Sequence, residues 1–377
     1  MEVKSTRLDF KNTNMLSVLI DIVRGVAILL VVMVHLRNTV REYEGFNFMY
    51  NNGQGLVVDF FFFGTAGVAL FFLISGFLLD FLYHKNMDLK KFTVKRVARI
   101  FPAWFLWHVI ALIVAYAGLK WVFQEKTEME YVYGSVQPVT SWETLAFFTT
   151  SLLFLGWVNF NIWNTYIPGG WSIQSEVQHY IMFPVLNKIQ TWQMLSGLLV
   201  LQVYGLVSGV TYSSQIAAAF ITSPFWFITG IVMSRFLRNY REGVNMFTPS
   251  EALLVLALIT STVTLRASHI SQLSTILVII ASLFVSTLIY KNVSLTKLAV
   301  NIGKYSYGIY FNHFIFVLPA GYVVAYVITT YETYYLLAPM LIVAFLTVTV
   351  VSYFVAKIMY DFYEKKFLIK ANQMFNK

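Results

Sequence analysis

The sequence predicts an all-α polytopic membrane protein, a bundle of about ten transmembrane helices. Hydrophobic residues make up 58% of the chain and charged residues only 12%, which is about half the charge of a soluble domain. The mean hydropathy is +0.66. Long apolar runs recur along the chain, and the net charge of +9 falls in the short loops between them. This pattern indicates a topology signal and argues against nucleic acid as a partner.

Runs of about 17–25 mostly apolar residues predict the membrane spans. They lie near 16–36, 58–83, 100–119, 171–188, 193–211, 216–234, 251–267, 271–290, 304–328 and 335–357. The run 145–158 is short for a span and is expected to be re-entrant or interfacial. Lys and Arg then gather on one side, which predicts a protein of the cell membrane with both termini cytoplasmic. We expect one membrane domain, 1–377, with a helical core at 16–357 and short tails.

Two basic residues share one face of the first predicted span. Arg24 and His35 lie eleven positions apart, so they project the same way, roughly 16 Å apart along the helix axis. Ionisable side chains inside a membrane are costly and are functional candidates by default. Histidine can take and return a proton near neutral pH. The structural alternative pairs Arg24 with Asp21 and gives His35 a hydrogen bond to a neighbouring helix.

Basic residues also open the third predicted span. Lys95, Arg96 and Arg99 precede its apolar part, and the two arginines share a helix face. Arginine pairs can clamp phosphate groups. Ordinary anchoring by positive charge on the inner side explains the same pattern.

A third group of polar residues follows a Gly-Gly turn. The segment that begins at Trp171 carries four polar residues at helical spacing, which places them on one face of a helix. They are Ser172, Glu176, His179 and Tyr180. A carboxylate, an imidazole and hydroxyls that converge inside a membrane predict a proton relay or a polar substrate pocket. The alternative is a hydrogen-bond network that only fixes helix packing.

Two weaker candidates lie in other spans. Ser306, Tyr310 and His313 share a face of the span near 304–328, where Tyr310 and His313 are candidate pocket residues or a satisfied core pair. Ser75 lies in a small-residue segment of the second span, which predicts close helix packing and, less directly, a place on the substrate path.

The chain has no cysteine, so thiolate nucleophiles and disulfides are excluded, and no metal-ligand spacing occurs.

Taken in order, the segments 20–35, 72–79, 95–102, 171–180 and 306–313 resemble the motifs of the integral-membrane acyltransferase 3 family. The resemblance implies a ten-span bundle that takes an acyl group, usually acetyl, from acyl-coenzyme A. The acceptor is a hydroxyl, commonly on a cell-surface sugar. The family's motifs fall on Arg24 and His35, with the histidine essential, and on Arg96 and Arg99, which handle the donor. His179 stands where the family usually has an aromatic residue.

The resemblance therefore implies a membrane O-acyltransferase with acyl-CoA as donor substrate and no permanently bound cofactor. We expect the phosphates of coenzyme A to bind Arg96 and Arg99, with Lys95, Arg235 and Arg238 nearby. His35 would act as general base or transient acyl carrier. Glu176, of the tryptophan–glutamate motif with Trp171, would orient the imidazole, and Arg24 would stabilise the oxyanion.

Two other functions fit the same residues. A transporter or flippase for a glycan precursor would also carry intramembrane charges, but it would often show an internal repeat, and none is visible. A protein that only supplies acyl groups to a separate extracytoplasmic partner is the third possibility. The sequence leaves open the glycan or glycolipid acceptor and the acyl group, acetyl or longer.

Overall fold

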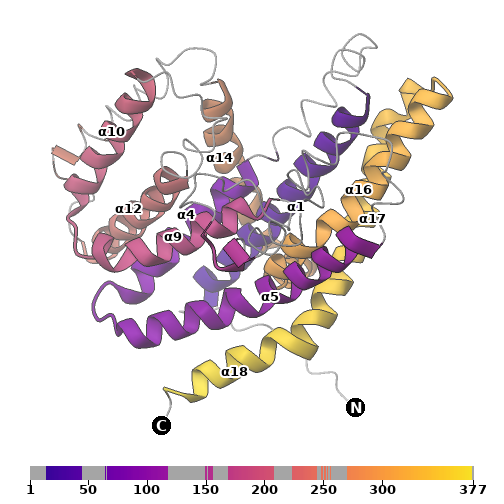
Figure 1. The fold of residues 1–377 in the computed structure, drawn as a ribbon. Coiled ribbons are helices and arrows are strands. Elements are labelled where there is room, and N and C mark those ends of the chain that lie inside the picture. The colour runs from indigo at the N-terminus through magenta and orange to yellow at the C-terminus, as the bar shows by residue number, and fades with distance from the viewer. Residues whose placement is uncertain are drawn as a thin grey trace, which may run out of the picture.

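The structure is a computed structural model of the chain. It describes residues 14–44, 64, 66–117, 149–150, 152–155, 169–207, 223–243, 248, 250–251, 253, 255 and 270–375. Every regular element within these residues is a helix, which confirms the all-α class (Figure 1).

The described helices follow the order of the predicted spans. They are α1 (Asn14–Glu44), α4 (Ala66–Tyr83), α5 (Leu89–Ala117), α9 (Trp171–Leu186), α10 (Thr191–Val207), α12 (Ser223–Arg241), α14 (Ile270–Lys291), α15 (Val293–Lys304), α16 (Ser306–Thr330), the 3-10 turn η4 (Tyr334–Leu336), α17 (Leu337–Met359), the π-helix η5 (Tyr360–Glu364) and α18 (Lys365–Gln373). Most of the predicted span 251–267 and most of the segment 145–158 lie outside the described residues.

Two helical segments extend what the apolar runs predict. α5 begins at Leu89, so the basic residues before residue 100 form its first turns instead of a loop. α15 occupies a stretch expected to connect two spans, and Asn292 caps it by accepting hydrogen bonds from the backbone of Ser294 and Leu295. Both differences arise because helix-forming polar residues continue a helix beyond its apolar part.

Four helices of the described chain are long and apolar enough to cross a membrane. They run over Met15–Val40, Ala66–Tyr83, Ser306–Thr330 and Leu337–Gln373. About half of each of the first three is buried inside the protein and the rest faces outward, as expected for spans that contact both neighbouring helices and lipid. The protein is therefore a polytopic helical membrane protein.

Helix α1 forms the centre of the bundle. It packs against α4, α14, α15 and α16, and its apolar side chains contribute much of the continuous core. Beside it, α4 and α12 cross at very close range. A Cβ atom at Gly76 would lie 1.9 Å from the carbonyl oxygen of Phe227, and one at Gly230 would lie 2.0 Å from that of Leu73. Only glycine permits this crossing.

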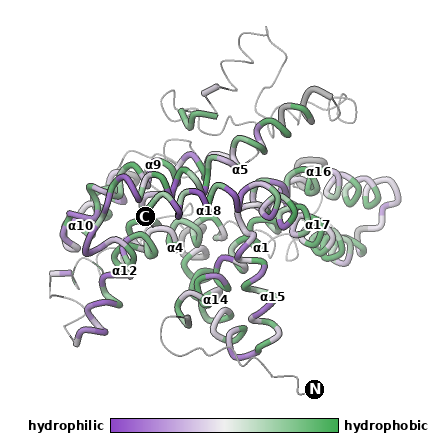
Figure 2. Tube along the Cα trace, turned by 90° about the horizontal axis from the view of Figure 1, so that it is seen from below, coloured by the Kyte–Doolittle hydropathy of each residue, from purple (hydrophilic) through white to green (hydrophobic). Residues whose placement is uncertain are grey.

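The C-terminal helices return to the basic end of α5. The π-helix η5 links α17 to α18, and α18 runs beneath α5 and contacts it (Figure 1). Hydrophobic residues predominate along α16 and α17, whereas hydrophilic stretches gather where α5 and α18 pass each other (Figure 2). One end of the bundle is therefore rich in charge, and the predicted site residues of α1, α9 and α16 extend from that end into the core.

Candidate functional site

Glu176 is the hub of the polar residues inside the bundle. Its carboxylate oxygen Oε1 accepts hydrogen bonds from the phenols of Tyr180 and Tyr307. Tyr180 lies one turn further along α9, whereas Tyr307 comes from α16. Tyr307 is not among the site residues predicted from the sequence, although it lies one turn before Tyr310 on the same helix. The signal that could have found it is its place in the family-like motif 306–313.

The two arginines of α5 lie on these tyrosines. The guanidinium carbon of Arg96 is 5.3 Å from the ring centroid of Tyr180, and that of Arg99 is 4.8 Å from the ring centroid of Tyr307. Both distances are within the range of a cation–π interaction. Arg96 and Arg99 thus share one face of α5, as predicted, and this face is directed at the Glu176 hub. Lys95 lies half-buried beside them on the same helix.

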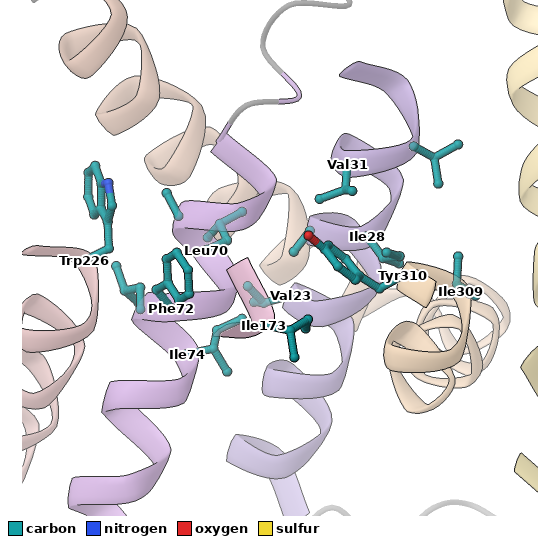
Figure 3. Close-up of a cluster of buried hydrophobic side chains, with 14 of the residues drawn as sticks. Val23, Ile28, Val31, Leu70, Phe72, Ile74, Ile173, Trp226, Ile309 and Tyr310 are labelled. Atoms are coloured by element: carbon teal, nitrogen blue, oxygen red, sulfur yellow. The ribbon is translucent and has the colours of Figure 1, made fainter. Parts of the chain in front are cut away.

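A second hydrogen-bonded group continues from this hub toward the core. The hydroxyls of Ser172 and Tyr310 are 2.5 Å apart, and Tyr310 donates to the carbonyl of Gly169 at 2.7 Å. Gly169 has φ +72°, so the turn before α9 uses the left-handed region to place this carbonyl over α16. Figure 3 shows Tyr310 reaching from α16 into the space between α1 and α4.

A pocket lies between these helices. It is small, with a cavity volume of about 20 Å³, and its walls combine aromatic side chains with the polar groups of α9 and α16. The residues that shape it include Phe71, Phe72, Ser172, Glu176, Tyr307 and Tyr310. Trp171 packs edge-on against Phe72, with 6.4 Å between ring centroids, and Ser75 is half-buried on α4.

His35 lies at the other end of this path, on α1. Its half-buried ring is 5.3 Å from that of His313 and 4.4 Å from that of Phe314, measured between centroids. His313 in turn lies 5.8 Å from Tyr310. The contacts of His35 are therefore with α16. The expected contact with Glu176 is not among those that the described residues show, and His313 lies in its place.

Arg24 lies instead in the N-terminal half of α1, toward the charged end of the bundle. Its guanidinium is 3.3 Å from the carboxylate of Asp21, which is the pairing considered from the sequence. Arg99 is near enough to act electrostatically on both members of this pair. Because three helical turns separate Arg24 from His35, about 16 Å, the two cannot act on the same atom of a small group.

His179 lies in a packing interface. It is fully buried, stacks on Phe227 at 4.5 Å between centroids and meets Phe72 edge-on. Its Nε2 atom is 3.3 Å from the hydroxyl of Ser223. The ring thus fills the space where α4, α9 and α12 meet, with the shape of an aromatic residue, and it does not line the pocket described above.

Arg235 and Arg238 also have partners within the protein. Both bind the fully buried carboxylate of Asp80, at 3.0 and 3.2 Å, and Arg235 donates to the carbonyl of Ile189 at 2.6 Å. These contacts tie α12 to α4 and to the end of α9. Arg235 and Arg238 therefore join helices through a buried carboxylate. Arg96 and Arg99 differ from them, because they contact the rings of Tyr180 and Tyr307.

Replacing Asp80 with alanine is expected to destabilise the protein strongly, because two arginines would lose their buried partner. Breaking such a pair typically costs about 3–5 kcal/mol. Thermal unfolding in detergent would measure the loss. The matched control is Asp361→Ala, since this carboxylate is exposed and its removal should leave the transition unchanged. Equal transitions for both variants would contradict a joining role for Asp80.

The fold and the site define a helical membrane protein whose pocket is lined by phenols and a carboxylate, with two imidazoles packed beyond Tyr310. A family profile described as an acyltransferase domain matches residues 18–357. The chain therefore belongs to the acyltransferase 3 family and is an acyltransferase, which confirms the resemblance seen in its motifs.

Two relatives agree with this assignment. Nodulation protein 10 of Rhizobium leguminosarum bv. viciae is 29% identical over 161 residues, which cover 39% of this chain and 40% of that protein. The chain thus matches less than half the length of the nodulation protein. ORF330 of Acidianus two-tailed virus, whose name describes an acetyltransferase, is 25% identical over 264 residues, 66% of this chain and 72% of the viral protein. No solved structure gives a significant match.

Proposed function

We propose that the protein is an O-acyltransferase of the cell membrane that moves an acetyl group from acyl-CoA to a hydroxyl of a surface carbohydrate. The observation that supports the proposal is the series of polar groups inside the bundle, which runs from the arginines of α5 and Glu176 to Tyr310 of the pocket and then to His313 and His35. We propose ten spans, with both termini and the basic end of the bundle on the cytoplasmic side.

The donor would bind at the charged end. A guanidinium that stacks on a ring still offers N–H donors at its edge, and these suit the phosphates of coenzyme A. Arg96 and Arg99 are held in this way. Arg24 lies on the same side of the pocket, so we assign it to donor binding rather than to the oxyanion. The extended arm of the donor would then cover the roughly 16 Å that separate Arg24 from His35 along α1.

The reaction would take place at His35. Its imidazole removes the proton of the acceptor hydroxyl, and the oxygen attacks the thioester carbonyl carbon. The carbon–sulfur bond breaks, the acetyl group stays on the acceptor oxygen, and the proton passes from His35 to the departing thiolate. The pocket's aromatic walls would exclude water, which would otherwise compete with the acceptor for the acyl group.

The direct test is release of coenzyme A from acetyl-CoA by purified protein, followed with a thiol reagent. The chain has no cysteine, so the protein itself gives no background signal. We expect release that depends on a glycan acceptor extracted from the cell surface. A protein that binds acceptor and never releases coenzyme A would instead support a flippase.

Replacing Arg99 with alanine is expected to raise the KM for acetyl-CoA at least about tenfold and to leave kcat nearly unchanged, because only donor binding is lost. The same coenzyme A release assay measures both constants. Arg241→Ala is the matched control, since this arginine is exposed near the end of α12. An unchanged KM in Arg99→Ala would exclude Arg99 from the donor site.

A further inference from the structure

His313 is a buried imidazole whose tautomer is fixed by its own helix. Its Nδ1 atom lies 2.7 Å from the carbonyl oxygen of Tyr310 and 3.1 Å from that of Ile309. A carbonyl oxygen can only accept, so Nδ1 must carry the hydrogen in both contacts. In the neutral ring, Nε2 is then an unprotonated nitrogen with a free lone pair.

Among the residues that the structure describes, that nitrogen has no partner. Nε2 of His313 is buried and makes no hydrogen bond, and the whole residue is inaccessible to solvent. Buried polar atoms are paired in the great majority of cases, and an exception calls for an explanation.

The nearest imidazole is that of His35. The two ring centroids are 5.3 Å apart and the rings are tilted by 46°, so a small rotation brings a nitrogen of one ring to a nitrogen of the other. Phe314 packs against both rings, at 4.4 and 4.2 Å, and so limits their movement. An unprotonated acceptor with no partner among the described residues therefore belongs to the ring beside the histidine proposed to act as base.

We propose that His313 is the positioning partner of His35. Its Nε2 accepts the N–H of the His35 ring, which leaves the other nitrogen of His35 unprotonated and directed at the acceptor hydroxyl. When His35 takes the hydroxyl proton, the same hydrogen bond stabilises the resulting imidazolium. No proton leaves His35 toward His313. The inference rests on the proposed function, in which His35 is the base, and it assigns to His313 the orienting role expected of Glu176.

Two variants separate this role from packing. In His313→Gln the amide oxygen can reach the position of Nε2 and accept, whereas in His313→Asn the amide replaces Nδ1 and leaves the Nε2 position empty. We expect His313→Asn to lower kcat about 100-fold and His313→Gln to remain within about tenfold of wild type. Neither variant should change the KM for acetyl-CoA. His108→Asn is the control, because Nδ1 of that buried histidine also lies 2.9 Å from a carbonyl of its own helix.

Wild-type kcat in His313→Asn, or equal losses in both folded variants, would overturn the proposal. A wild-type protein that releases no coenzyme A would refute the proposed function instead. The His313 assignment is then judged by nitrogen-15 NMR of histidine-labelled protein, with the His35 signal assigned from its loss in His35→Gln. We expect one His35 tautomer in wild type and a mixture in His313→Asn. The same mixture in both would contradict the assignment.

Discussion

Replacing His35 with alanine is expected to lower acyl transfer about 1,000-fold while donor binding stays intact. General base catalysis contributes effects of about 100- to 10,000-fold, and His35 lies on α1 beside His313, whose ring is 5.8 Å from that of Tyr310. Its ring contacts are with His313 and Phe314, so its removal affects few structural contacts. Coenzyme A release with saturating acetyl-CoA measures kcat.

Binding of coenzyme A to the same variant provides the control. Because the arginines of α5 contact the tyrosines of the Glu176 hub and not His35, the dissociation constant should equal that of wild type. A His35→Ala protein that keeps wild-type kcat would show that His35 is not the base. Loss of both binding and transfer would show that the variant disturbs the fold rather than the chemistry.

Replacing Glu176 with glutamine is expected to lower kcat/KM about 100-fold, chiefly through a higher KM for the donor. The carboxylate accepts from both Tyr180 and Tyr307, and these rings hold Arg96 and Arg99. The amide group of glutamine would direct hydrogens at one of the two phenols. Hydrogen bonds to a charged acceptor are about twice as strong as neutral ones, so the arginines should lose their fixed position. Steady-state kinetics with varied acetyl-CoA separates KM from kcat.

The matching variant is Tyr307→Phe, which removes one of the two hydroxyls and keeps the ring under Arg99. We expect a loss of about tenfold, smaller than that of Glu176→Gln because one donor remains. Tyr331→Phe serves as control, since Tyr331 is 66% exposed. Glu176→Gln kinetics that match wild type, or a change confined to kcat, would contradict a role for Glu176 in holding the donor arginines.

Hydrophobic patterning predicted the helical class and the position of most described helices, because apolar runs of bilayer length have few alternatives to a helix. The predicted faces were informative as well. Arg96 and Arg99 do share a face, and Glu176 and Tyr180 do meet. These pairs lie within one helix, where spacing alone fixes the neighbours.

Contacts between helices could not be predicted in this way. The sequence gives no reason to pair Glu176 with Tyr307, His35 with His313, or Arg235 with Asp80, because these pairs depend on how distant segments pack. The expected link between His35 and Glu176 is one example, since both residues fit a catalytic pair and the structure gives each a different partner. The grouping of Arg235 and Arg238 with Arg96 and Arg99 is another, because basic residues at the inner ends of helices look alike in sequence.

The most direct test of the account is transfer across a sealed membrane. Wild-type protein is reconstituted in liposomes, with carbohydrate acceptor on one face and acetyl-labelled acetyl-CoA on the other, and His35→Ala liposomes serve as the blank. We predict labelled acceptor only when acetyl-CoA is on the face of α18 and the basic end of α5, with no label in the blank. Equal labelling from either face, or labelling that requires donor and acceptor on one face, would contradict the path from the arginines to His35.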